Sequence, residues 1–228
     1  MPFQMVHLSV ARKAAMLVPG AIKDFSQYYL GSLAPDAVHF RADFTRELKR
    51  ISHLCCDDEP WGETIDNEGW TENVLRFRRA YEGDAGMDFI NGYCVHVLTD
   101  VRNNIDLAIP FKLREFQAMQ IPDAHRATAL QRFNADALYA DRRIYAESPY
   151  RKGIWADLRR SGVTALRGIV SETEVRKIRE HILDVQYQNV PVDASHIADV
   201  FSYAEYARFM DVAARWIANI LFGAETAC

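Results

Sequence analysis

Residues 89–101 form an apolar run that contains one histidine and one aspartate, His96 and Asp100, four residues apart. At this spacing both side chains share one face of a helix. The helix is apolar on nearly every other face, which predicts that it is buried. An ionised carboxylate in such a helix needs a cation, a metal ion or a set of hydrogen-bond donors, because burying it alone is very costly. The pair therefore predicts a metal site on a buried helix.

Apolar residues recur at helical spacing along almost the whole chain, and the alternation typical of strands is nearly absent. One early stripe joins Val6, Val10, Ala14 and Leu17. Helices are predicted at about residues 71–82, 88–105, 124–146, 172–187 and 203–222. The last two begin with capping-box patterns at residues 171–174 and 202–205. Together these patterns predict an all-α bundle of about seven to nine helices.

The composition fits one domain over residues 1–228, because 228 residues that are 49% hydrophobic are enough for one substantial core. The net charge of -4 gives no basic surface for nucleic acid and no general attraction to anionic membranes. No apolar stretch reaches the roughly 20 residues that span a bilayer, and a signal peptide is not evident. The spacing of the four cysteines does not resemble a disulfide framework. We expect a cytoplasmic protein without a transmembrane segment; its oligomeric state is not predicted.

Residues 54–70 are acidic and interrupted by Pro60, Gly62 and Gly69, a composition that predicts a loop. A loop of this length in a compact domain is often functional. The first half of the chain is therefore where we expect the chemistry.

Three further residues in the first half are candidate metal ligands. His7 lies on the same helical stripe as Val10 and Ala14, where a core histidine bonded to a carbonyl is the alternative. Asp36 follows a turn and could equally cap a helix. His53 stands at the start of the acidic loop, where a surface histidine is the alternative. Together with His96 and Asp100, these residues supply the mixed nitrogen and oxygen ligands that suit zinc, manganese or iron.

The order of these motifs resembles the zinc-dependent phospholipase C family, whose superfamily includes single-strand-specific fungal nucleases. The motifs are His7-Leu-Ser-Val-Ala-Arg, Tyr29-Leu-Gly-Ser-Leu-Ala-Pro-Asp36, Lys49-Arg-Ile-Ser-His53 and Gly92-Tyr-Cys-Val-His96-Val-Leu-Thr-Asp100. The resemblance covers residues 5–105, and residues 106–228 would complete the helical bundle. It implies an all-α fold around a metal cluster, with phosphate esters as substrates. It also implies that His7, Asp36, His53, His96 and Asp100 are metal ligands, with Asp100 placed to bridge two ions.

The chain departs from this family in two respects. It begins Met1-Pro2, whereas secreted members use the amine of an N-terminal tryptophan as a ligand. It also lacks the downstream His-x-x-x-Glu pair, since the residues four positions after its later histidines are Ala129, Val185 and Val200. Possible substitute ligands are Asp106, Glu115, His125, Asp136 and Asp141, for which solvated charges on helix faces are the alternative. One or two ions are expected rather than three.

Such a cluster predicts a metal-dependent phosphoester hydrolase in which a metal-activated hydroxide attacks a phosphodiester. Asp36 or Asp100 could orient or deprotonate the water. Arg41, Lys49 or Arg102 could hold the remaining phosphate oxygens. The expected substrate is a small-molecule or lipid phosphoester. The alternatives are a nuclease-type phosphodiesterase, which the acidic charge disfavours, and a non-catalytic helical protein with a structural zinc site.

Overall fold

A computed structural model of the protein describes residues 2–56, 64–83, 86–117, 123–188 and 191–224. These residues form helices connected by short loops, with one isolated bridge between Leu166 and Val170 and no strand among them. The all-α fold predicted from the sequence is confirmed. Ten α-helical segments occur in the described part of the chain, slightly more than expected, because the short helices α3 and α6 add to the longer ones.

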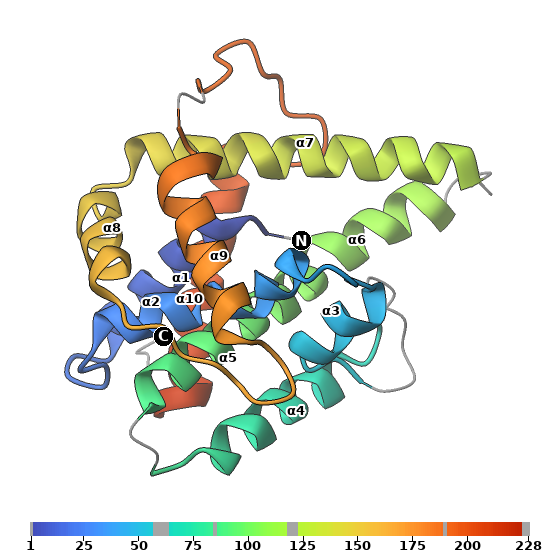
Figure 1. Cartoon of the computed structure of the whole chain (residues 1–228). Helices are drawn as coiled ribbons and strands as arrows, with labels where there is room; N and C mark the ends of the chain where they lie inside the picture. Colours follow the sequence, from blue (N-terminus) through green and yellow to red (C-terminus); the bar gives the residue numbers. More distant parts are fainter. Residues whose placement is uncertain (1, 57–63, 84–85, 118–122, 189–190, 225–228) are drawn as a thin grey trace.

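The helices and helical turns follow one another along the chain in the order that Figure 1 shows. Their bounds are α1 (Gln4–Leu17), α2 (Phe25–Gly31), the 3-10 helix η1 (Ala34–Phe40), α3 (Arg46–Ser52), α4 (Asn67–Ala80), α5 (Met87–Asn103), the π-helical turn η2 (Asn104–Ala108), α6 (Ile109–Lys112), the π-helical turn η3 (Leu113–Gln117), α7 (Asp123–Glu147), α8 (Arg151–Arg160), α9 (Glu172–His181), the π-helical turn η4 (Ile182–Gln186) and α10 (Tyr203–Phe222).

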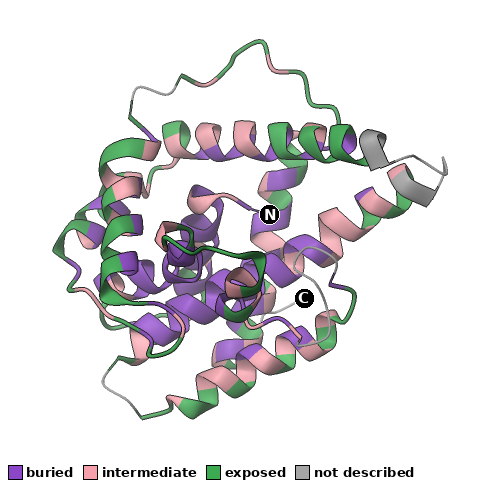
Figure 2. Ribbon diagram, turned by 45° about the vertical axis from the view of Figure 1, so that its right-hand side comes forward, coloured by how far each residue is buried: buried purple, intermediate pink, exposed green. Residues whose placement is uncertain are grey.

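The helix α5 lies at the centre of the bundle, where it packs against α1, α2, α4 and α10. Every residue from Phe89 to Val101 is buried, as the apolar run predicted. Figure 2 shows the buried residues gathered on the central helices, while the outer faces of α4 and α7 are exposed. The burial of α5 places its two polar side chains, His96 and Asp100, inside the core.

Two glycines allow α2 and α5 to approach closely. A Cβ atom on Gly92 would lie 1.9 Å from the carbonyl oxygen of Tyr28, and one on Gly31 would lie 2.0 Å from the carbonyl oxygen of Phe89. Any larger residue at either position would separate the helices. Since Ser32 directly follows α2, this contact brings its backbone against α5.

The predicted helix limits hold best where a cap marks them. Both capping boxes are present, and α10 spans the predicted residues. The helix α4 begins at Asn67, inside the predicted loop, because Asp66 accepts a hydrogen bond from the backbone of Gly69 and caps it. The helical path of α5 continues past residue 105 through η2, and Pro110, which was expected to bound the helix, is the second residue of α6. The central part of the predicted loop, residues 57–63, lies outside the described residues.

No helix in the described ranges has the length and apolar character required to cross a bilayer.

Candidate metal centre

The five predicted ligand residues come from four separate elements and meet in the core. His7 belongs to α1, Asp36 to η1, and His96 and Asp100 to α5, while His53 is the residue that ends α3. All five are buried, and none is more than 6% exposed. The structure therefore brings together every residue that the sequence motifs nominated.

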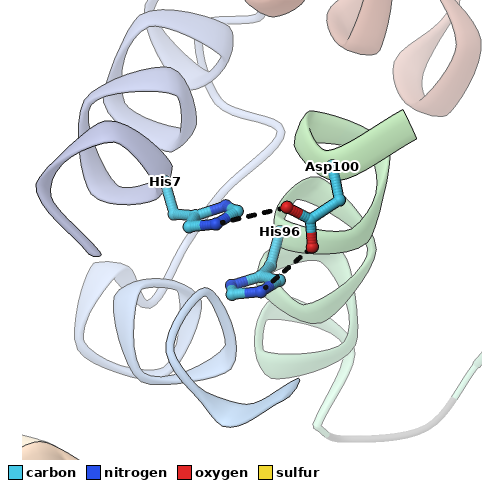
Figure 3. Close-up of side chains that lie close together, drawn as sticks. All are labelled: His7, His96 and Asp100. Carbon is cyan, nitrogen blue, oxygen red and sulfur yellow. Dashed lines mark ion pairs between the residues drawn. The ribbon is translucent and has the colours of Figure 1, made fainter. Parts of the chain in front are cut away.

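One group of ligand atoms consists of His7, His96 and Asp100. The Nε2 atom of His7 lies 3.6 Å from Oδ1 of Asp100, and Nε2 of His96 lies 3.5 Å from Oδ2. Figure 3 shows the two imidazole rings parallel to each other with Asp100 facing both; their centroids are 3.6 Å apart. Both histidines therefore direct a ring nitrogen at the same carboxylate.

A second group consists of Asp36, His53 and His96. The Nε2 atom of His53 lies 3.4 Å from Oδ1 of Asp36 and 3.3 Å from Nε2 of His96. It also lies 3.5 Å from Oδ2 of Asp100, which joins the two groups. Two donors on a tetrahedral ion with bonds of about 2.0–2.1 Å are roughly 3.4 Å apart. The donor separations in the cluster have this size, so the five side chains could hold a metal ion.

The hydrogen bonds and charges within the cluster also fit a cation. Neither carboxylate oxygen of Asp100 has a hydrogen-bond partner, and burial, followed by the charge of Asp36, raises the pKa of Asp100 well above its usual value. Burial lowers the pKa of His96 to about 4 and that of His53 to about 3, and it lowers the pKa of His7 well below its usual value. Neutral imidazoles are the form that binds metals. A divalent cation bound here would balance the charge of the Asp100 carboxylate, whose oxygens make no hydrogen bond within the protein.

Backbone carbonyls fix the orientation of two imidazoles. The Nδ1 atom of His96 lies 2.8 Å from the carbonyl oxygen of Ser32, and Nδ1 of His53 lies 3.0 Å from that of Lys49. Because a carbonyl oxygen only accepts, Nδ1 carries the proton in each ring when this bond forms. The lone pair on Nε2 then points into the cluster, which is the arrangement found around metal-bound histidines.

Asp36 is held by groups outside the cluster. Gln4 donates to Oδ2 from Nε2 at 3.1 Å, and the Lys49 ammonium lies 3.1 Å from Oδ1. Burial opposes ionisation of this carboxyl, but Lys49 and the nearby histidines outweigh it and hold its pKa well below the usual range. Asp36 makes no capping hydrogen bond to η1, so the alternative of a helix cap is not what the structure shows.

A cavity of about 530 Å³ adjoins the cluster. Its wall includes Asp36 and Lys49 from the cluster and aromatic residues such as Phe111 and Phe133. A volume of this size is typical of small-molecule sites. The cluster is therefore buried yet adjoins a space that a ligand can enter.

Of the three basic residues nominated for phosphate binding, only Lys49 lines the cavity. Arg41 is paired with Glu174 and donates to the carbonyl oxygen of Ile169, and Arg102 binds Asp106 through two donors. Proximity in sequence to a ligand was misleading for both arginines, because each has a carboxylate partner elsewhere.

The proposed substitute ligands in the second half lie in other environments. Glu115 and Asp106 are paired with arginines, and the side chain of His125 is outside the described residues. Asp136 accepts hydrogen bonds from His196 and from the backbone of residues 199–201. It anchors the segment before α10. Asp136 is 2% exposed, so the alternative of a solvated charge is wrong for this residue.

That alternative is also wrong for Asp141, which is completely buried. Its carboxylate accepts from the backbone nitrogen of Met5 at 2.8 Å and from the Tyr187 hydroxyl at 2.7 Å. Next to Tyr187, Gln186 donates to Oε1 of Gln4 at 2.9 Å. Residues of the second half of the chain thus hold the first turn of α1 in place. This turn carries His7 and also Gln4, which donates a hydrogen bond to Asp36.

Gln4, His39 and Asn103 are among the residues of the cavity that were not identified from the sequence. Gln4 and Asn103 each lie three residues from a nominated ligand on the same helix, and His39 lies three residues after Asp36. The i, i+3 spacing was the available signal for all three. The Nε2 atom of His39 lies 2.9 Å from Nζ of Lys49 and 3.6 Å from Oδ1 of Asp36.

Comparison of the chain with known proteins gave no match to any family model, curated protein or solved structure. The resemblance to the phospholipase C family therefore stays a prediction from the sequence motifs, and the chemistry of the site is inferred from its own geometry.

Proposed function

We propose that the protein is a metal-dependent phosphoester hydrolase, similar to phospholipase C, that holds one or two Zn²⁺ ions at His7, Asp36, His53, His96 and Asp100. The observation that supports this proposal is the convergence of three imidazole nitrogens and two carboxylates next to a cavity lined by an ammonium group. Manganese or iron would suit the same mixed ligands.

A divalent ion bound here would lower the pKa of a coordinated water towards neutrality and would stabilise negative charge on a phosphoryl oxygen. The residues of the chain supply the remaining functions. Lys49 offers a positive charge on the cavity side, where the ester would enter. Asp36 and Asp100 are the carboxylates placed to orient or deprotonate the water, in addition to binding the ion.

The cavity favours hydrolysis over a purely structural zinc site. A structural site is closed by four protein ligands, whereas a catalytic site keeps one position for water or substrate. Asp36 takes part in the cluster and also lines the cavity, so the cluster has a side from which a substrate can approach. The size of the cavity favours a small-molecule or lipid phosphodiester over a folded nucleic acid.

The test combines metal analysis with an activity panel. Protein purified without chelators should contain at least one equivalent of transition metal by elemental analysis. With zinc or manganese it should hydrolyse bis(4-nitrophenyl) phosphate, vesicles of choline phospholipid or single-stranded DNA faster than the His96→Ala variant does. His181→Ala, which changes a histidine of α9 that packs on Phe40 and is not one of the five candidate ligands, is the matched control and should keep both metal and activity.

Metal well below one equivalent, with no uptake on titration, would refute the metal site. If the protein binds one equivalent of metal but hydrolyses none of the substrates, the metal has a structural role and the protein is not a hydrolase of this kind. Activity on DNA alone would support metal-dependent hydrolysis but would show that the protein is a nuclease.

A further inference from the structure

Asn103 is a buried polar residue without a partner in the wall of the cavity. It is the last residue of α5, and its side chain lines the cavity together with Asp36 and Lys49. The residue is 1% exposed, and neither the nitrogen nor the oxygen of its carboxamide makes a hydrogen bond. Both polar atoms are therefore unsatisfied in the protein alone.

Neighbouring asparagines show how unusual this is. Asn104 donates from its amide to the carbonyl oxygen of Thr64 and to Oδ1 of Asn67. Asn91, which also belongs to α5, accepts a hydrogen bond from Arg78 at 2.9 Å. Buried carboxamides are normally paired in this way, and an unpaired one lowers stability. Asn103 is thus a residue for which the folded chain alone gives no explanation.

The position of Asn103 relates it to the candidate metal centre. It lies three residues after Asp100, so the two side chains are neighbours on one face of α5. The carboxylate of Asp100 likewise makes no hydrogen bond, and Lys49 lies in the same cavity wall. An anion that approaches the cluster from the cavity would meet a positive charge from Lys49 and a neutral N–H donor from Asn103.

We propose that Asn103 binds the phosphoryl group of the ligand by donating from Nδ2 to one of its oxygens, while Oδ1 accepts from a water molecule in the cavity. The inference rests on the proposed function, because it places the phosphoryl group at the cluster. Hydrogen bonds from neutral donors to charged oxygens are stronger than those between neutral groups. The unpaired carboxamide is then explained as a donor that is satisfied only when the ligand is bound.

The test measures binding of inorganic phosphate to the metal-loaded protein by calorimetry. Phosphate should bind the parent, and Asn103→Leu, which keeps the side-chain size, should bind it about tenfold or more weakly. Asn103→Asp should also bind it more weakly, because a carboxylate repels the anion. The control is Asn219→Leu, the same substitution at an exposed amide of α10 outside the lining of the cavity, which should keep the parent affinity.

A second measurement separates ligand binding from a structural role. Without phosphate, Asn103→Leu should melt at the same temperature as the parent or higher, since it removes an unpaired buried amide. A clear fall in melting temperature would show that the carboxamide has a structural partner and would overturn the proposal. So would absent phosphate binding by the parent, unchanged affinity in Asn103→Leu, or equal loss in Asn219→Leu. Hydrolysis by the parent together with any of these results would leave the proposed function intact.

Discussion

Substitution of Gly92 by alanine should weaken both the fold and the metal centre, because it forces α2 and α5 apart. The new Cβ would lie 1.9 Å from the carbonyl oxygen of Tyr28 and 3.0 Å from the nitrogen of Ser32. Both atoms belong to the backbone, so neither can move aside by changing a rotamer. Ordinary contact then requires the helices to separate locally by about 1.5 Å.

The expected loss of stability follows from two opposing effects. Overpacking of a buried contact costs about 1–3 kcal/mol, and replacing glycine by alanine within a helix returns about 0.5–1 kcal/mol. A net loss of about 1 kcal/mol would lower the melting temperature by roughly 2–4 °C in a chain of this size. The separation would also stretch the 2.8 Å contact between Nδ1 of His96 and the carbonyl oxygen of Ser32. Losing such a support typically weakens metal binding by about tenfold or more.

Calorimetric melting and zinc titration of the Gly92→Ala variant measure these two effects. Gly153→Ala is the matched control, since Gly153 lies within α8 and a Cβ there would meet no atom within 4 Å. The control should be slightly more stable than the parent and bind zinc equally well. A Gly92→Ala protein with the melting temperature and zinc affinity of the parent would refute the close contact as the support of His96.

Three further results are expected. Because burial raises the pKa of Asp141 from 3.8 to about 7, the folded protein keeps a proton that the unfolded chain releases. The free energy of unfolding measured in urea should therefore fall with rising pH between about 4 and 7, by about 1.4 kcal/mol per pH unit relative to Asp141→Asn; parallel pH profiles would contradict this. Gln4→Leu removes a donor to Asp36 and should weaken zinc binding about tenfold by titration, whereas unchanged affinity would exclude that support. A chelator should lower the melting temperature of the parent but hardly that of Asp100→Asn, and equal shifts would remove Asp100 from the site.

The burial of α5 and the pairing of His96 with Asp100 could be predicted because their signals are local, whereas His7, Asp36 and His53 were nominated from the order of the motifs. An uninterrupted apolar run requires burial, and the spacing of His96 and Asp100 alone places them on one face. The distances among the ligands could not be predicted in the same way. They depend on contacts between elements, above all the approach of Gly31 and Gly92 that brings Ser32 to His96.

The roles of Asp136 and Asp141 could not be predicted from the sequence for the same reason. Their partners lie 46 residues or more away in the chain, at Met5, at Tyr187 and at residues 196–201. The sequence of a long helix such as α7 does not show which of its charged residues will be covered by segments that are distant in the chain. The bonds of Arg41 to Glu174 and Ile169 are likewise distant in sequence, so its availability to a phosphate was overestimated.

The number of donor atoms limits how many ions the cluster can hold. His96 has only Nε2 to offer, since Nδ1 faces the carbonyl oxygen of Ser32, so it cannot serve both groups of ligands at once. The five side chains together provide three imidazole nitrogens and four carboxylate oxygens, fewer donors than two four-coordinate ions require. Two bound ions would therefore keep at least one position for water or substrate, whereas a single ion could be closed by protein ligands. Zinc stoichiometry is thus informative about function: two equivalents would favour the hydrolase, and one equivalent that survives dialysis without turnover would favour the structural site.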